Sequence, residues 1–412
     1  MNIKRLAASI LALTFVFGGI ALPNAVVGNT FISASAADAL TYGDYEYHLT
    51  YKYGTVEIVK YNGTDEVVEI PSEIDGIAVT SIYRNAFSDN KTIKSVAIPD
   101  GVTDIGHDAF SGCDSLVEVT MTDSVETIAE NAFISCGNLK SVKLSKGLTK
   151  IAEKTFMDCT NLTDIELPSG IKSIGKKAFR SCKNLEKINL PDGLKTIGNE
   201  AFFNCEKLVS ISMPDSLTSM GYYNFFECYA LKDVKLSANL TSMGSWCFEY
   251  CTSLKKLDIP ASLNSIGTSS FTYNYRSTDE NKEPSFTLNC YNGSVAVKHA
   301  LASGVNFKII DAENKTEFPE ISEAKFAKVS RVNSTDYYQF RLNWTPVEGA
   351  KEYGVAVKLS GKWKVQVYTD KTTFTSPKIR KNSKYDLVIC AKVNGKWETT
   401  DFTSRAFTVA VR

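Results

Sequence analysis

A repeat of 23 residues constrains the fold of this chain more than any other feature of its sequence. Nine phenylalanines stand 23 residues apart, and seven units also carry a cysteine three residues after the phenylalanine and a leucine three residues after the cysteine. A short unit cannot bury its apolar face alone, so neighbouring units must stack into a solenoid. The phenylalanines are Phe87, Phe110, Phe133, Phe156, Phe179, Phe202, Phe225, Phe248 and Phe271.

Each unit is predicted to hold two short strands and one wide apolar turn. Its pattern is Leu-x-x-Ile-x-Leu-Pro-x-x-Leu-x-x-Ile-Gly-x-x-Ala-Phe-x-x-Cys-x-x. In one unit Leu139, Val142 and Leu144 lie in a run whose end alternates between apolar and polar residues. This alternation is typical of a strand with one face turned inward. Leu148 and Ile151 supply a second wall, and Phe156 fills the widest part of the cross-section.

Proline and glycine mark the corners of the unit. Proline cannot donate to a strand ladder, so the prolines that follow the first strand indicate a corner. Six units carry glycine after the isoleucine, but Tyr83, Ala129 and Ala152 take that position elsewhere. We therefore expect close packing at a turn, not a left-handed backbone, to favour glycine there. The prolines are Pro99, Pro168, Pro191, Pro214 and Pro260, and the glycines are Gly106, Gly175, Gly198, Gly221, Gly244 and Gly267.

With these motifs, residues 79–276 resemble the BspA-type leucine-rich repeats of bacterial surface proteins. The resemblance implies a mostly β fold, in which a leucine-rich-repeat solenoid is closed by caps, and a role in adhesion. Residues 37–78 are predicted to form an N-terminal β cap with a hairpin, and residues 277–312 a C-terminal cap. In the latter we expect a short helix from its N-cap Ser294 to its stop at Gly304, followed by a strand at Phe307–Ile310.

Seven of the ten cysteines form one column of the repeat. Equivalent residues of adjacent units come within bridging distance, but seven in one column cannot all pair, and each stands where a small apolar side chain packs. We expect a buried, reduced ladder and no zinc site, because a single file does not place four ligands around one point. Cys247, Cys290 and Cys390 fall on strand-like apolar positions and are expected to be buried as well. The column is Cys113, Cys136, Cys159, Cys182, Cys205, Cys228 and Cys251.

The first 36 residues have the pattern of a signal peptide. Lys4 and Arg5 precede the apolar run Leu6–Leu22, and small residues at Ala34 and Ala36 provide a cleavage site. The run is short for a membrane span, although an uncleaved anchor is the alternative. We expect a secreted or extracellular chain with no membrane span after cleavage, held to the cell wall, if at all, without a covalent bond.

The pattern changes after a predicted linker at residues 313–318. Apolar residues alternate up to Trp344 and again from Tyr385, so residues 319–412 resemble a fibronectin type III domain. Trp344 then takes the place of the core tryptophan and Tyr385 that of the tyrosine corner.

Charge is balanced overall but unevenly placed. Lysine plus arginine equals aspartate plus glutamate, 46 of each, which excludes a basic nucleic-acid binder judged on net charge. Residues 37–317 carry a net charge of −10 and residues 318–412 one of +8. The basic C-terminal domain is therefore a candidate for binding an anionic cell wall by charge.

Aromatic residues concentrate at variable positions from the sixth unit onward. Tyr223 and Trp246 stand at the same position of successive units, so we expect their rings to stack about 5 Å apart. Tyrosine and tryptophan gathered on a surface are enriched at binding sites, and the alternative is that they pack on the following loop or on the C-terminal cap. The predicted ligand-binding residues are Phe203, Tyr222, Tyr223, Phe226, Tyr229, Trp246, Tyr250, Tyr273 and Tyr275.

Two further surfaces are weaker candidates. Lys362 with Trp363, and Lys396 with Trp397, follow glycines at predicted hairpins and form a possible site for sugars or anionic polymers; alternatively the tryptophans simply cover the sheet. The outward side chains of the first strands alternate in sign, as neighbouring strands require. There Asp164 and Glu166 face Lys187 on the next strand, so they are not assigned as a general acid and base.

The sequence therefore favours a non-catalytic, monomeric binding protein without a cofactor or metal. Only three histidines occur, and no phosphate loop or calcium loop is present. By resemblance, the partner is a host or microbial surface protein, or a polysaccharide. The alternative is a structural spacer or a wall-associated, glycan-binding accessory protein.

Overall fold

The computed structural model describes residues 39–50, 54–271, 286–311, 318–332, 334–399 and 403–411. The predicted signal peptide and residues 313–317 of the predicted linker lie outside the described residues. Within the described ranges, no helix has the length and apolar character that a membrane crossing requires.

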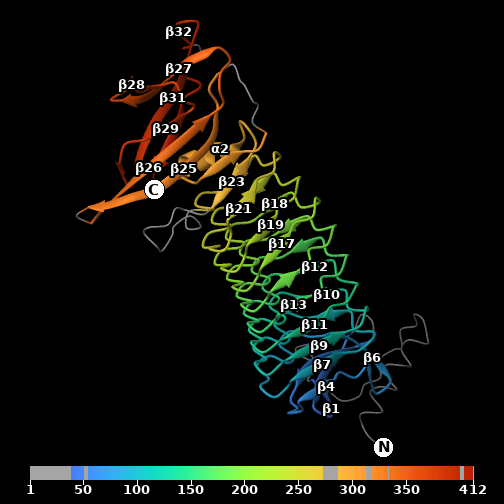
Figure 1. Ribbon diagram of the computed structural model, residues 1–412. Coiled ribbons are helices and arrows are strands. Elements are labelled where there is room, and N and C mark those ends of the chain that lie inside the picture. The colour runs from blue at the N-terminus through green and yellow to red at the C-terminus, as the bar shows by residue number, and fades with distance from the viewer. Residues whose placement is uncertain are drawn as a thin grey trace, which may run out of the picture. The chain divides into compact units, whose positions relative to one another are not determined.

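The first strands of successive units form one wall of the solenoid, side by side in Figure 1. After the first pair, those that form ladders pair in parallel at a spacing of 23 residues, so that Asp164 faces Lys187 and Ser210 faces Asp233. The predicted alternation is confirmed, because Val142 and Leu144 are buried while Ser141 and Lys143 are exposed. The strands are β4 (Val67–Glu69), β7 (Ser95–Ile98), β9 (Glu118–Met121), β11 (Ser141–Lys143), β13 (Asp164–Ile165), β15 (Lys187–Ile188), β17 (Ser210–Ser212), β19 (Asp233–Lys235) and β21 (Lys256–Asp258).

A second parallel wall consists of strands that are mostly two residues long. Each strand ends in a buried or nearly buried isoleucine or methionine, and Leu148 and Ile151 contribute to the core as predicted. The strands are β6 (Ile77–Ile82), β8 (Asp104–Ile105), β10 (Thr127–Ile128), β12 (Lys150–Ile151), β14 (Ser173–Ile174), β16 (Thr196–Ile197), β18 (Ser219–Met220), β20 (Ser242–Met243) and β22 (Ser265–Ile266).

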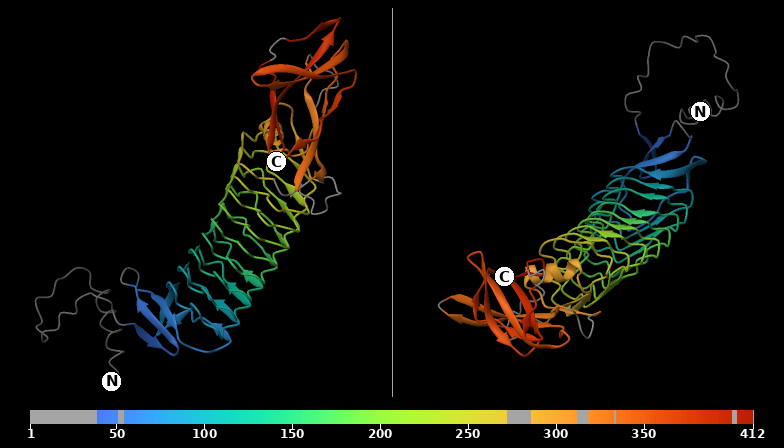
Figure 2. Two further views of the ribbon diagram at one scale, coloured as in Figure 1. Left: turned by 90° about the vertical axis from the view of Figure 1, so that its left-hand side faces the viewer. Right: turned by 90° about the horizontal axis from the view of Figure 1, so that it is seen from above.

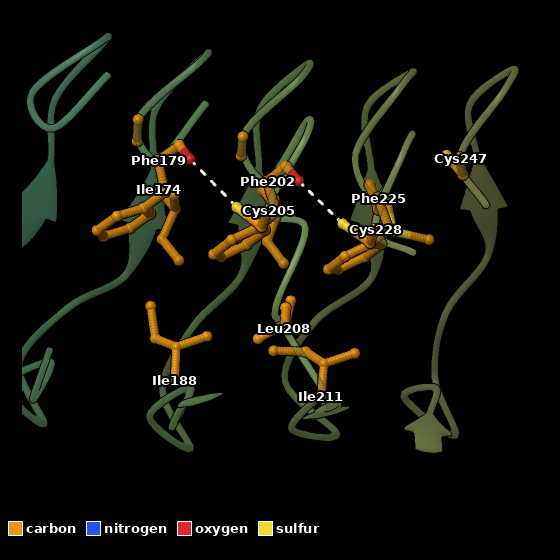
Figure 3. Packing of buried hydrophobic residues seen from close by; sticks show 14 of the residues in the cluster. Ile174, Phe179, Ile188, Phe202, Cys205, Leu208, Ile211, Phe225, Cys228 and Cys247 are labelled. Atoms are coloured by element: carbon orange, nitrogen blue, oxygen red, sulfur yellow. Dashed lines mark hydrogen bonds between the residues drawn. The ribbon is translucent and has the colours of Figure 1, made fainter. Parts of the chain in front are cut away.

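The third side of each unit is a chain of turns that carries the repeated phenylalanine. All nine phenylalanine rings are essentially inaccessible to solvent, and they stack with centroids 4.8 to 6.2 Å apart. Figure 3 shows Phe179, Phe202 and Phe225 in this stack, facing Ile188 and Ile211 of the first wall. The caps extend the stack, because Tyr61 lies 5.3 Å from Phe87 and Phe286 lies 5.7 Å from Phe271.

Backbone hydrogen bonds join these turn segments in one direction. The N–H of each repeated phenylalanine from Phe87 to Phe248 donates to a carbonyl of the next unit, over 2.8 to 3.1 Å. The residues two before and two after the phenylalanine have positive φ in nearly every unit. At Phe110 these residues are Asp108 and Gly112. The backbone of each unit is thus left-handed at two positions, and this conformation points alternate N–H groups toward the following unit. Few of the residues at these two positions are glycine, although glycine adopts the conformation most easily.

The glycines after the second wall are required for space, as predicted. None of the six has a positive φ. An added Cβ at Gly198 would lie 2.6 Å from the backbone nitrogen of Lys176, and one at Gly244 would lie 2.5 Å from that of Tyr222. The proline corners are also confirmed, because the Pro191 carbonyl accepts a turn hydrogen bond from the Leu194 N–H.

All ten cysteines lie in described segments, are buried and form no disulfide. Each thiol of the seven-membered column donates to the phenylalanine carbonyl 26 residues earlier, over 3.0 to 3.3 Å. Figure 3 shows two of these bonds, from Cys205 to Phe179 and from Cys228 to Phe202. The strand expectation for Cys247 was wrong, because Cys247 lies in a turn and donates to the Gly221 and Gly244 carbonyls. Cys290 and Cys390 do lie on strands.

Short antiparallel pairs close the amino-terminal end of the repeats. The β1–β2 and β2–β3 pairs are antiparallel, and β3 then pairs in parallel with β6 of the second wall. The strands are β1 (Leu40–Tyr42), β2 (Tyr45–Leu49), β3 (Val56–Tyr61) and β5 (Glu73–Ile74).

At the other end, β23 (Thr287–Cys290), α2 (Val295–Ser303) and β24 (Phe307–Ile309) follow the last described repeat. The helix has the predicted N-cap Ser294, and Gly304 ends it in the left-handed conformation. The Ser294 hydroxyl makes no capping hydrogen bond, so its capping role, which the sequence suggested, is limited to backbone conformation.

Two antiparallel sheets complete the chain, orange to red in Figure 2. They share a core in which the Trp344 and Tyr353 rings lie 5.5 Å apart. One sheet contains β25 (Ile321–Val332), β26 (Thr335–Trp344), β29 (Thr373–Thr375) and β30 (Ile379–Arg380). The other contains β27 (Ala350–Leu359), β28 (Lys362–Thr369), β31 (Ser383–Val393), β32 (Lys396–Trp397) and β33 (Phe407–Val411).

The glycine column yields a matched test of packing between units. We expect Gly198→Ala to lower the free energy of unfolding by about 1–3 kcal/mol, because the new methyl group overpacks the backbone of the preceding unit. Gly137→Ala is the control, since its Cβ would approach no atom closer than 3.8 Å, and it should be neutral or slightly stabilising. Urea denaturation measures both, and equal losses would contradict the packing explanation.

The buried thiols predict loss of stability at alkaline pH. Burial raises the pKa of Cys228 and Cys247 to about 12, whereas an unfolded thiol titrates near pH 8.5. Between these pH values the folded state binds more protons, so the free energy of unfolding falls as pH rises, by up to about 1.4 kcal/mol per pH unit and thiol. Urea midpoints from pH 7 to 10.5 measure the slope. It should be shallower in the Cys228→Ala variant, and an unchanged slope would refute this account.

Candidate functional site

Seven described aromatic residues gather on the turns after the second-wall strands β16, β18 and β20. We call them the aromatic patch; Tyr273 and Tyr275, which were predicted to join it, lie outside the described residues. Tyr222 and Tyr229 are each 40% exposed, and the other members are half-buried. The patch consists of Phe203, Tyr222, Tyr223, Phe226, Tyr229, Trp246 and Tyr250.

Two short ring ladders form the centre of the patch. Tyr223 and Trp246 stack with centroids 4.8 Å apart and planes 5° apart, which confirms the predicted stacking. Beside them, Phe203 and Phe226 stack at 5.0 Å. The Tyr223 ring meets Phe226 edge-on at 5.3 Å, so the two ladders pack against each other. Such geometries stabilise aromatic pairs beyond the area that they bury.

An arginine continues one ladder into the preceding unit. The Arg180 guanidinium lies over the Phe203 ring, 4.0 Å from its centroid, and also donates to the half-buried Glu200 carboxylate. The sequence analysis did not single out these two residues. The signal was available, because Arg180 precedes Phe203, and Glu200 precedes Tyr223, by one repeat length.

Three members of the patch have backbones that are unfavourable for their residue type. Tyr223, Trp246 and Tyr250 have φ values of 57°, 56° and 61°, a conformation that is a genuine outlier for a bulky side chain. At the equivalent positions other units carry mostly small or charged residues such as Asn131, Lys177 and Ser269. Backbone strain of this kind clusters at functional sites.

Acidic side chains border the patch on the Tyr229 side. Burial, followed by the Glu227 and Glu206 carboxylates, raises the pKa of Tyr229 above its usual value. Glu206 is itself paired with Lys183 over 2.9 Å. The Tyr229 hydroxyl therefore stays neutral at physiological pH and is available for hydrogen bonding.

The outward face of the first wall is hollowed but polar. A hollow of about 490 Å³ runs over β9, β11 and β13 and includes Glu118, Lys143 and Glu166. Asp164 faces Lys187 across the ladder, as predicted. The side chains alternate in sign along this face, which is the arrangement that parallel neighbours need.

In the C-terminal sheets, Trp363 and Trp397 are half-buried and cover the outer side of the β27–β31 pair. They pack on Ala356, Val388 and Cys390, a small cluster separate from the main core. The cations over their rings are Lys358, at 5.9 Å, and Lys392, at 5.4 Å. These lysines are cross-strand partners of the tryptophans, not the sequence neighbours Lys362 and Lys396 that the sequence analysis paired with them.

Among the described residues, no group of three or more histidine, cysteine, aspartate or glutamate side chains is placed to hold a metal ion. The thiols of the repeat are enclosed in the core, and burial raises the pKa of Cys182, Cys205 and Cys251 well above its usual value. These groups remain protonated and out of reach of a substrate.

Comparison with known proteins assigns the repeat. A family model described as "BspA type Leucine rich repeat region" matches residues 80–208 and 172–285 in six copies, which together span half of the chain. No curated protein matches.

Similar solved structures include two proteins described as leucine-rich and one vaccine antigen. A leucine-rich repeat protein of T. pallidum has 28% identity over 53% of this chain and 91% of its own, with a TM-score of 0.41. The pneumococcal vaccine antigen PcpA has 16% identity over 68% of this chain and 86% of its own, with a TM-score of 0.41. A leucine-rich cell surface protein of Faecalibacterium prausnitzii has 22% identity over 68% of this chain and 97% of its own, with a TM-score of 0.29.

The strained position of Tyr223 predicts that the patch is not needed for folding. In Tyr223→Asn, a residue that tolerates positive φ recovers about 1 kcal/mol of backbone strain, while loss of the stack on Trp246 costs about 0.5–1.5 kcal/mol. The net change in unfolding free energy should stay within about 1 kcal/mol. By contrast, Phe225→Ala in the buried stack should cost about 3–5 kcal/mol. Urea denaturation of both variants tests this, and a large loss in Tyr223→Asn would make the patch part of the core.

Proposed function

This chain belongs to the BspA type leucine-rich repeat family, and from that premise we propose that it is a non-catalytic binding protein of the bacterial surface. In this proposal the repeat solenoid holds a protein partner through the aromatic patch. The single observation that carries the proposal is the pair of packed ring ladders, of which the Tyr223–Trp246 ladder is built on strained backbone, with Tyr222 and Tyr229 exposed beside them.

The strain favours selection for binding over selection for stability. Polar residues at the same positions serve the other units, and Asn131 has the same backbone conformation as Tyr223. Aromatic side chains there therefore add nothing that the solenoid needs for its hydrogen bonds. They do supply large, rigid contact area of the kind found at the centre of protein interfaces.

The stacking favours a protein surface over a sugar ring as the ligand. A sugar needs an open aromatic face on which to lie, but Arg180 and Phe226 lie against the Phe203 ring, and Trp246 covers a face of Tyr223. The most exposed members of the patch are Tyr222 and Tyr229, at 40% each, and the Glu206 and Glu227 carboxylates lie near Tyr229. Such a surface suits apolar and basic side chains of a protein partner.

Location and domain identity are parts of the same proposal. The signal-peptide pattern of residues 1–36 supports export. The C-terminal sheets support a fibronectin type III domain, because β25, β26 and β29 face β27, β28, β31 and β33 around the buried Trp344. A tyrosine corner needs a tyrosine hydroxyl that bonds to the backbone of a nearby loop. Here that hydroxyl belongs to Tyr353, which accepts a hydrogen bond from the Val347 N–H over 2.9 Å, and no such bond involves Tyr385 within the described residues.

The excess of basic residues in this domain supports retention on an anionic wall at low salt.

The test is binding of the full chain to the surfaces of host epithelial cells and of neighbouring bacteria. The double variant Tyr223→Asn/Trp246→Ser replaces both stacked rings by residue types found in the same column of other units. We expect this variant to lose at least tenfold in affinity in a flow-cytometry titration with labelled protein. Lys154→Asn, in the same column but outside the patch, is the matched control and should bind like the wild type.

Pretreatment of the target surface distinguishes a protein from a polysaccharide. Protease should abolish the part of wild-type binding that the double variant lacks, whereas periodate, which oxidises sugar diols, should leave that part intact. Sensitivity to periodate alone would replace the protein partner with a polysaccharide. Equal binding by the double variant and the wild type would reject the aromatic patch as the site.

A further inference from the structure

A second surface, in the C-terminal sheets, has an aromatic ring that is more exposed than any ring of the aromatic patch. Tyr368 of β28 is 59% exposed and stands opposite Gly354 in the ladder. Its ring lies 5.4 Å from Trp397 at a tilt of 43°. A Cβ at Gly354 would approach Trp397 to 3.3 Å and Tyr368 to 3.7 Å, so the missing side chain is what lets both rings settle over the strand.

Tyr368 borders a hollow of about 820 Å³ at the end of the sheet. We call it the C-terminal hollow; Glu352, Asp370, Lys392 and Asn394 also contribute to it. Lys392 Nζ donates to Glu352 Oε2 over 3.0 Å and lies over the Trp397 ring. This contact holds an ammonium and a carboxylate side by side, each about one-third exposed.

The chemistry of the hollow suits a neutral, polyhydroxylated ligand. Each sugar hydroxyl both donates and accepts a hydrogen bond, so two neighbouring hydroxyls match the acceptor Glu352 and the donor Lys392. The Asn394 amide offers both functions, and the exposed Tyr368 ring can receive the apolar C–H face of a pyranose. Pockets of this kind combine an apolar wall with a few convergent polar groups.

The charges of the hollow are mixed and do not form a basic site that would select an anionic polymer. Three lysines and two carboxylates line it, which leaves a net charge of only +1, and one of the lysines, Lys392, is already paired with Glu352. A carboxylate next to the aromatic wall would repel a sulfated or uronic acid chain. We infer that the C-terminal hollow is a glycan-binding site that takes neutral sugar units. This site is independent of the protein partner proposed for the aromatic patch.

The test uses the purified full chain and affinity gel electrophoresis. The neutral probes are hydroxyethylcellulose, xylan, β-1,3-glucan and galactomannan, and the anionic probes are heparin and polygalacturonate. We expect retardation by at least one neutral probe that persists in 0.5 M NaCl. Tyr368→Ala should weaken it at least tenfold, Glu352→Ala should weaken it as well, and Tyr368→Phe should retain most of it because the ring face remains.

Tyr222→Ala in the aromatic patch is the matched control, since it removes another exposed tyrosine, and it should leave the retardation unchanged. Absence of retardation by every neutral probe overturns the inference, and so does binding to anionic probes alone. An equal effect of Tyr222→Ala and Tyr368→Ala would place glycan binding elsewhere. Each of these results is separate from the cell-binding experiment, in which the Tyr223 and Trp246 positions are changed.

Discussion

The one-way hydrogen-bond ladder on the turn side is the constraint on which the rest of this structure depends. Each repeated phenylalanine N–H donates to the next unit, so units must follow one another at one spacing and in one register. That spacing brings the phenylalanine rings into contact and places each column thiol against a carbonyl of the preceding unit. It also leaves no room for a Cβ at the six glycines that follow the second wall, from Gly106 to Gly267. Ring stacking, thiol burial and glycine choice are therefore consequences of one backbone arrangement.

Most of the solenoid could be predicted because its core residues are chemically uniform. Phenylalanine, cysteine and leucine recur at fixed intervals, and each position has one environment. The left-handed positions could not be predicted, because residues as different as Asn131, Lys177 and Trp246 take the same positive φ. Hydrogen bonds to the next unit determine their conformation, so side-chain preference carries little signal there. Cys247 was expected on a strand because of its apolar neighbours, but it lies in one of these turns, where hydrogen bonds to other units determine the backbone conformation.

The C-terminal sheets show how three-dimensional pairing changes a motif. Lys362 and Trp363 are adjacent in sequence, but successive residues of a strand point to opposite faces. The hairpin turn at Ser360–Gly361 instead sets Lys358 opposite Trp363. Burial on both sides of β27 also hides the alternation that normally identifies a sheet face. The tryptophans cover one side of β27 and β31 and the core covers the other. The exposed aromatic surface that remains lies at Tyr368, which the sequence did not single out.

The junction between repeats and C-terminal sheets follows from the same ladder principle. Strand β23 pairs in parallel with β21, β24 pairs in parallel with β23, and β25 then pairs antiparallel with β24. The Asn306 side chain accepts a hydrogen bond from the Phe326 N–H over 2.7 Å. The first sheet of the C-terminal region is thus a continuation of the repeat wall. An open solenoid end exposes unpaired backbone groups, and a strand that pairs with it removes that edge. For this reason the C-terminal sheets serve as a cap as well as carrying the proposed glycan site, and binding is best measured on the whole chain.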